Sequence, residues 1–223
     1  MGEKQSVSLP PKSKGKLRIK NEELEVDSKT QRLTHSSINT FKHSRHSFIM
    51  NENYIQHSGG AIGADHEWTR QGAPFGVVSR HYWYGRRTPY GNVEISKADY
   101  DEGCRHVLQA NSTLHRRPER HMNLLARNWC QVKCSEAVFA IGQLKNGVVA
   151  GGTGWAVQMA IDVRKPVCLF DQEWEEWFTY RDGAWVSCDV PVLTYDFAGI
   201  GSRDISAAGI RAIGEVYRNT FGI

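Results

Sequence analysis

The chain lacks the apolar run of roughly 18 to 20 residues that a membrane-spanning helix needs. Its first 20 residues are polar and basic, without the apolar stretch of a secretory signal. We therefore expect no membrane segment, no export and a cytoplasmic location. The composition, 40% hydrophobic and 23% charged over 223 residues, is that of a globular protein.

Cysteine is sparse, and its spacing argues against both disulfides and metal binding. The five cysteines are an odd number and are scattered, whereas disulfide frameworks belong to short secreted chains rich in loops. Cys130 and Cys134 lie about one helical turn apart, but no second pair with zinc-like spacing follows them. We expect reduced thiols and no metal site.

The common nucleotide and nucleophile motifs are also missing. The sequence has neither the glycine fingerprint of dinucleotide-binding enzymes nor the lysine-containing phosphate loop of nucleoside triphosphatases, and no G-x-S-x-G elbow. These absences disfavour an ordinary NAD-dependent enzyme and a P-loop ATPase. Ser58 and Ser202 remain as candidate nucleophiles, and His57 and His66 are the histidines nearest to a glycine turn.

Positive charge is concentrated in the first 50 residues. They hold ten Lys or Arg and five Asp or Glu out of totals of 28 and 24, which leaves 18 against 19 for residues 51–223. We therefore divide the chain into a basic, largely flexible tail, residues 1–50, and a ligand-binding domain, residues 51–223. The basic stretch 12–20 suits nucleic acid or an acidic partner, although such segments are more often solvated extensions. The nearly neutral domain favours a small ligand over an extended polyanion.

Short apolar strands, glycine turns and helical stretches alternate from about residue 51 onward, which is typical of α/β architecture. The run AVFAI at residues 137–141 has the continuous apolar character of a strand covered on both faces. We predict a mostly parallel sheet with helices on both faces and a small β-hairpin insertion over 177–187. The expected strands are 54–57, 75–79, 137–141, 166–170 and 194–198, and the expected helices include 95–110, 118–132 and 207–221.

Three of the expected strand-to-helix turns are rich in glycine. Because parallel strands end at the same edge of a sheet, these turns should line one crevice, where backbone N–H groups and helix N-termini bind anions. Asp65 either accepts from sugar hydroxyls or caps a helix. The candidate ligand-binding residues are Ser58, Gly59, Gly60 and Asp65 in the first turn, Gly151, Gly152, Thr153 and Gly154 in the second, and Gly201, Ser202 and Arg203 in the third.

The turn sequences SGGAIGAD, AGGTGWAVQMA and AGIGSRD together resemble the SLOG superfamily, which includes LOG hydrolases, DprA and YpsA-type proteins. The resemblance covers about residues 53–222 and implies a Rossmann-like fold. It also implies a circular permutation, because the GIGSR-type turn comes first in the usual order and last here. That order is similar to YpsA-like proteins assigned as molybdenum cofactor carriers. By the same resemblance, Arg127 and Asn128 are expected beside the ligand crevice.

Three functions remain open. LOG hydrolases carry a glutamate where this chain has Gln158, and an amide supplies neither negative charge nor a general base. The resemblance therefore favours a sensor or carrier of a nucleotide or nucleotide-derived molecule, with molybdenum cofactor a less favoured cargo. The alternatives are a nucleoside-phosphate N-glycosidase with a displaced carboxylate and DprA-like binding of single-stranded DNA. The arginines and aromatics between 80 and 127 suit a stacked base, single-stranded DNA or a homo-oligomer interface.

Overall fold

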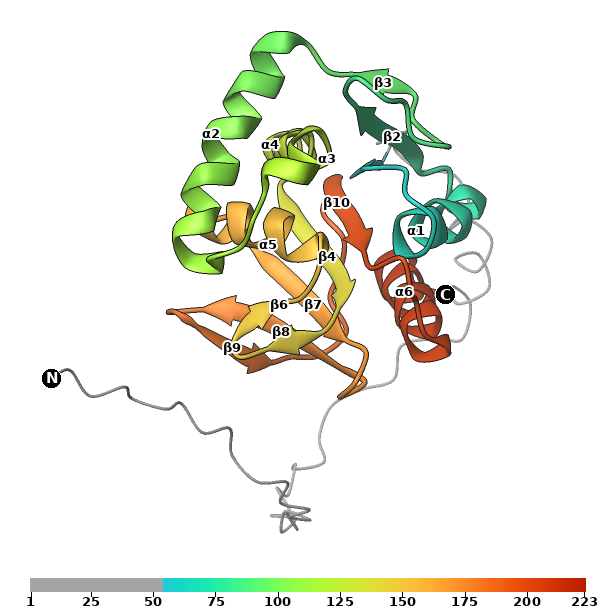
Figure 1. The fold of residues 1–223 in the computed structure, drawn as a ribbon. Coiled ribbons are helices and arrows are strands. Elements are labelled where there is room, and N and C mark those ends of the chain that lie inside the picture. The colour runs from blue at the N-terminus through green and yellow to red at the C-terminus, as the bar shows by residue number, and fades with distance from the viewer. Residues whose placement is uncertain (1–53) are drawn as a thin grey trace, which may run out of the picture. The chain divides into compact units, whose positions relative to one another are not determined.

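An eight-stranded sheet organises residues 54–223, the part of the chain that the computed structural model describes (Figure 1). The strand order is β3-β2-β1-β10-β4-β7-β8-β9. All neighbours from β3 to β7 run parallel, and β8 and β9 extend the sheet antiparallel to β7. The α/β architecture with a mostly parallel sheet is confirmed. The predicted flexible tail, residues 1–50, lies outside the described residues.

The elements have the following bounds. The parallel strands are β1 Ile55–Ser58, β2 Val78–Trp83, β3 Val93–Glu94, β4 Ala137–Gly142, β7 Val167–Asp171 and β10 Asp196–Gly201, and the antiparallel ones are β8 Glu176–Arg181 and β9 Ala184–Ser187. A separate two-stranded hairpin pairs β5 Leu144–Lys145 with β6 Val148–Val149. The helices are α1 Ala64–Gly72, α2 Lys97–Leu114, α3 Met122–Ala126, α4 Asn128–Lys133, α5 Thr153–Asp162 and α6 Ala207–Phe221.

Helices cover both faces of the sheet (Figure 1). The strand β4 therefore contacts a core on each face, which explains why its sequence is apolar throughout. Its residues alternate between two cores: Val138 packs with side chains of α2, α4 and α5, and Phe139 packs with side chains of α1 and α6. All six residues of β4 are buried. Side chains that point to either face of β4 are thus removed from water, and the burial of their apolar surface stabilises both cores.

The strand order matches a doubly wound sheet whose first unit has moved to the end of the chain. If β10 and α6 preceded β1, the five long parallel strands would read 3-2-1-4-5 across the sheet. Such a rearrangement needs neighbouring ends, and the ring of Tyr54 lies 5.0 Å from the ring of Phe221 near the C-terminus. The topology therefore agrees with the permuted order expected from the turns.

Three local predictions need correction. The strand expected over 75–79 begins at Val78, because Ala73–Phe75 form a 3-10 turn closed by left-handed Gly76. The helix expected over 118–132 is divided into α3 and α4 at Arg127. At this break the Cys130 N–H donates to the carbonyl of Arg127, only three residues earlier. The hairpin over 177–187 forms, but β8 and β9 continue the main sheet at its edge instead of standing apart.

Candidate functional site

The topology fixes where a ligand crevice belongs. The chain leaves β10 towards α6 on one face of the sheet and leaves β4 towards α5 on the other, although β10 and β4 are neighbours. Ligands of doubly wound proteins bind where the connections diverge in this way, beyond the carboxyl ends of the two strands. The third glycine turn follows β10, and the first follows β1, the other neighbour of β10. The second turn follows β4 after the β5–β6 hairpin, which brings the Ala150 N–H back to within 2.9 Å of the Gln143 carbonyl, directly after β4.

Asp65 joins the first and third turns. One oxygen of its buried carboxylate accepts from the N–H groups of Gly59 at 3.1 Å and Ala61 at 3.3 Å, and the other accepts from Gly201 N–H at 3.1 Å. Burial raises the pKa of Asp65, while the charge of Arg127 and the three N–H groups lower it. The structure thus places Asp65 as a support that holds two turns in register, with both carboxylate oxygens engaged.

The third turn begins later than expected. Gly201 is still part of β10, and a Cβ there would stand 2.6 Å from a backbone oxygen of β4, so this glycine serves close packing. The Ser202 hydroxyl donates to the Asp204 carbonyl at 2.9 Å and accepts from the Gln172 amide at 3.0 Å. Ser202 therefore bonds both within its own turn and to Gln172, which follows β7, and the side chain of Arg203 is exposed.

Arg127 is the buried cation of the site. Only 7% of its surface is exposed, and its guanidinium packs directly on Gly59, where a Cβ would lie 1.4 Å from Nη1. Its Nε is buried, and no group of residues 54–223 forms a hydrogen bond with it. Burial lowers the pKa of Arg127, and the charge of Asp65 partly opposes this effect. A buried guanidinium with an unmet donor is costly unless an anion or acceptor joins it.

Gln131 is a residue of this site that the sequence analysis missed. When its carboxamide is turned so that the oxygen faces the first turn, that oxygen accepts from Arg127 Nη1 and, at 3.3 Å, from Gly59 N–H. Asn128, one helical turn earlier, is buried beside it. Glutamine at the second turn of a short helix carries no sequence signal, so only the fold reveals it.

The second turn leaves open space at two of its three glycines. A Cβ at Gly151 or Gly152 would meet no atom within 4 Å, and no side chain caps the N-terminus of α5. A Cβ at Gly154, in contrast, would stand 2.0 Å from the Val149 carbonyl oxygen. Gly154 is therefore needed for packing, whereas Gly151 and Gly152 keep the approach to the helix N-terminus and to buried Thr153 clear.

Arg116 holds this turn in place. Its guanidinium donates to the carbonyls of Gly151 and Val149, both at 2.9 Å. Engaging these carbonyls fixes the backbone that precedes α5 and adds a positive charge beside its N-terminus. The sequence analysis counted Arg116 only among the arginines between 80 and 127 and did not predict its contact with this turn.

The side chain of Gln158 is bound within its own helix. Its amide nitrogen donates to the Asp162 carboxylate at 2.8 Å, one turn further along α5. Gln158 is thus part of an interaction within the helix.

Ser58 and His81 form a buried pair at the start of the first turn. The Ser58 hydroxyl lies 2.7 Å from His81 Nδ1 and accepts from Gly60 N–H at 3.1 Å, so both side chains support the turn. Burial lowers the pKa of His81 from 6.5 to about 4, with Arg127 adding to the effect. His81 was not among the residues expected here, because it lies on the adjacent strand β2.

The His81 pair predicts a loss of stability in mild acid. Because the pKa of His81 is lower in the folded state, its contribution is complete above about pH 6.5 and is lost as the pH falls towards 4. We expect the free energy of unfolding to drop by about 2 kcal/mol more between pH 7.5 and 5 in the native protein than in His81→Asn. Urea unfolding of both proteins at the two pH values measures this difference, and equal drops would contradict it.

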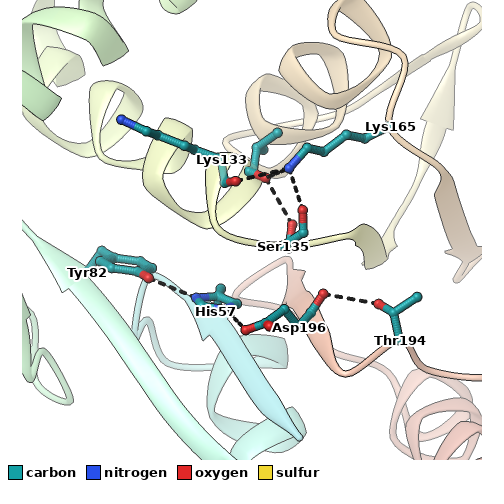
Figure 2. Close-up of polar contacts among 8 residues, drawn as sticks. His57, Tyr82, Lys133, Ser135, Lys165, Thr194 and Asp196 are labelled. Atoms are coloured by element: carbon teal, nitrogen blue, oxygen red, sulfur yellow. Dashed lines mark hydrogen bonds and ion pairs between the residues drawn. The ribbon is translucent and has the colours of Figure 1, made fainter.

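Figure 2 shows that His57 belongs to a different network. Its ring nitrogens bond to the Tyr82 hydroxyl at 2.8 Å and to Asp196 Oδ1 at 2.9 Å. Asp196 is the first residue of β10, at the edge opposite the glycine turns. Nearby, Lys165 donates to carbonyls at the end of α4. His57 and buried Tyr82 are thus structural and are not available at the crevice.

Residues 54–223 therefore form a doubly wound α/β domain whose three glycine segments gather at the carboxyl edge of one sheet. Comparison of the chain with protein-family models, curated proteins and solved structures finds no match. One surface hollow is lined by residues of α6, by Gly222 and Ile223 after it and by Val190. A second hollow is lined by residues of α6 and α1 and by Pro74. Neither hollow includes the glycine turns.

Two further findings concern only the described residues. Within 54–223, no group of three or more His, Cys, Asp or Glu side chains is arranged to hold a metal ion. No helix in the same range is long and apolar enough to cross a bilayer.

Proposed function

We propose that the glycine turns at the carboxyl edge of the sheet bind a nucleotide or another phosphate-bearing small molecule, as a sensor or carrier. The observation that carries the proposal is Arg127, a buried guanidinium packed on Gly59 with an unmet donor at Nε. A phosphate near the guanidinium would add to the partial compensation that the Asp65 carboxylate already gives this buried charge.

Other features of the three glycine turns also support an anionic ligand. The N-terminus of α5 has no side-chain cap and has open space at Gly152, and Arg116 and Arg203 add positive charge at the flanking turns. Backbone N–H groups at a helix N-terminus together with arginines are a common arrangement for phosphate. Asp65 keeps the first turn fixed against Gly201, which pre-forms this side of the crevice.

The same geometry favours binding over hydrolysis of an N-glycosidic bond. By the resemblance to LOG hydrolases, Gln158 stands where those enzymes have a glutamate, and its amide donates to Asp162. Both carboxylate oxygens of Asp65 already accept hydrogen bonds from backbone N–H groups. Incubation with a panel of nucleoside monophosphates separates the two functions. Binding without released base supports the sensor or carrier, and release of free base would replace it with the enzyme.

Gly152→Ala tests the site without disturbing the fold. Gly152 has helical φ and ψ of −67° and −33° and open space around it, so alanine should leave the melting temperature unchanged or slightly raised. The added methyl stands where a phosphate would approach the backbone, so we expect nucleoside monophosphates to bind about 10- to 100-fold more weakly. Isothermal titration calorimetry measures this loss.

Gly147→Ala is the matched control for this variant. Gly147 also has open space but lies in the turn between β5 and β6, and its φ of +79° makes alanine slightly destabilising. We expect this control to bind as the native protein does. Native affinity in a folded Gly152→Ala would reject the placement of phosphate at the start of α5.

A further inference from the structure

The loop between β2 and β3 adds an aromatic surface beside the first glycine turn. Because β2 is parallel to β1, this loop leaves the sheet at the same edge as the turn. The two segments are in contact: a Cβ at Gly60 would lie 2.9 Å from the Cβ of His81 and 3.2 Å from Thr88 Oγ1. The loop therefore borders the proposed phosphate site.

Tyr90 is the exposed ring of this loop. It stacks on His66, in the first turn of α1, with 4.5 Å between ring centroids and 17° between their planes. Tyr90 remains 41% exposed. The other aromatic residues of this region are engaged differently, since Tyr82 bonds to His57 and Tyr84 stacks on Tyr100 at 4.0 Å.

The loop that carries Tyr90 is held by several hydrogen bonds. Arg87 Nε donates to the Gly91 carbonyl at 2.6 Å, and Gly91 N–H donates to the Thr88 carbonyl at 3.1 Å. Asn92 exchanges hydrogen bonds with the backbone of His81 at 2.7 and 3.0 Å. A ring on such a loop is positioned before a ligand arrives, which lowers the entropic cost of stacking on it.

We propose that Tyr90, backed by His66, is a stacking platform for an aromatic base, so that the ligand class is a nucleoside phosphate and not a simple sugar phosphate. This inference rests on the proposed function, because the phosphate is assigned to the glycine turns and Arg127. A base has a flat face that stacks on tyrosine, whereas a sugar phosphate offers none. The platform lies along α1 and β2, on the side of the first turn away from β10.

The test compares two ligands on two variants of the full chain. Adenosine 5′-monophosphate carries a base, and ribose 5-phosphate carries only the sugar and the phosphate. In Tyr90→Ala we expect calorimetry to show about 5- to 100-fold weaker binding of the nucleotide and unchanged binding of ribose 5-phosphate. Tyr90→Phe keeps the ring and should bind both ligands as the native protein does.

Tyr195→Ala is the matched control, because Tyr195 is 48% exposed but contacts Tyr54 beyond the opposite end of β1. Native nucleotide affinity in Tyr90→Ala, or equal weakening of both ligands, would overturn the platform and leave the phosphate site in place. Failure of the native protein to bind either ligand would overturn both proposals. Circular dichroism of each variant establishes that it is folded.

Discussion

Replacement of Asp65 by asparagine is expected to lower the free energy of unfolding by about 3 kcal/mol. The carboxylate accepts three backbone N–H groups, from Gly59 and Ala61 on one oxygen and from Gly201 on the other. An asparagine offers one oxygen, so its NH2 group would face a backbone donor on the remaining side. The variant also leaves the buried charge of Arg127 without its nearby opposite charge.

Urea unfolding at neutral pH measures this loss, with Asp204→Asn as the control. Asp204 is an exposed aspartate in the third turn, so its replacement should change stability by less than about 0.5 kcal/mol. A difference of under about 1 kcal/mol between the two variants would contradict the role of Asp65 as the tie between turns.

Arg127→Met is expected to weaken the binding of nucleoside monophosphates by about 30- to 1,000-fold. Methionine retains much of the length and packing against Gly59 but removes the buried positive charge that the phosphate would neutralise. Inorganic phosphate should lose affinity in the same proportion, because the contact is with the anion.

Arg117→Met is the control for this second prediction. Arg117 is exposed in the loop before α3, so the variant removes one positive charge without touching the turns. Calorimetric titrations of both variants separate a specific contact from a general effect of net charge. Equal affinities of the Arg127 and Arg117 variants would contradict the assignment of the phosphate to Arg127.

The alternative of single-stranded DNA binding also makes a testable statement. A DNA complex held by the arginines between 80 and 127 or by residues 12–20 would weaken steeply as salt rises. We expect no such affinity from the folded part of the chain, because residues 51–223 hold 18 Lys or Arg against 19 Asp or Glu and so carry no net positive charge. Tight, salt-dependent binding of an oligonucleotide would favour this alternative.

Much of the fold could be predicted because local pattern and tertiary environment agree in it. The apolar run of β4 is buried on both faces, and the Asp182-Gly183 turn has the positive φ values, 49° and 83°, that its hairpin needs. Predictions failed where a long-range contact decides the local structure. The stretch 118–132 has helical spacing, but the helix is interrupted at Arg127, where the Cys130 N–H bonds to a carbonyl only three residues earlier. The side chain of Arg127 packs against Gly59 at this point.

The candidate site was likewise predictable from the sequence only in part. Glycine turns and their polar residues are visible in the sequence, and parallel topology explains why two of them meet at Asp65. The supporting residues His81, Arg116 and Gln131 come from a neighbouring strand, a loop and a short helix, and the sequence alone does not show that they contact the turns. The role of Asp65 as a tie also depended on knowing that Gly201 stands beside it.

The most direct test of the central claim is an amide NMR titration of the full chain with adenosine 5′-monophosphate. The account predicts that the largest chemical-shift changes occur at Gly59, Gly152 and Thr153, with a smaller set at the loop that carries Tyr90. Shifts confined to the hollows along α6, or no shifts at millimolar nucleotide, would contradict a phosphate site at the carboxyl edge of this sheet.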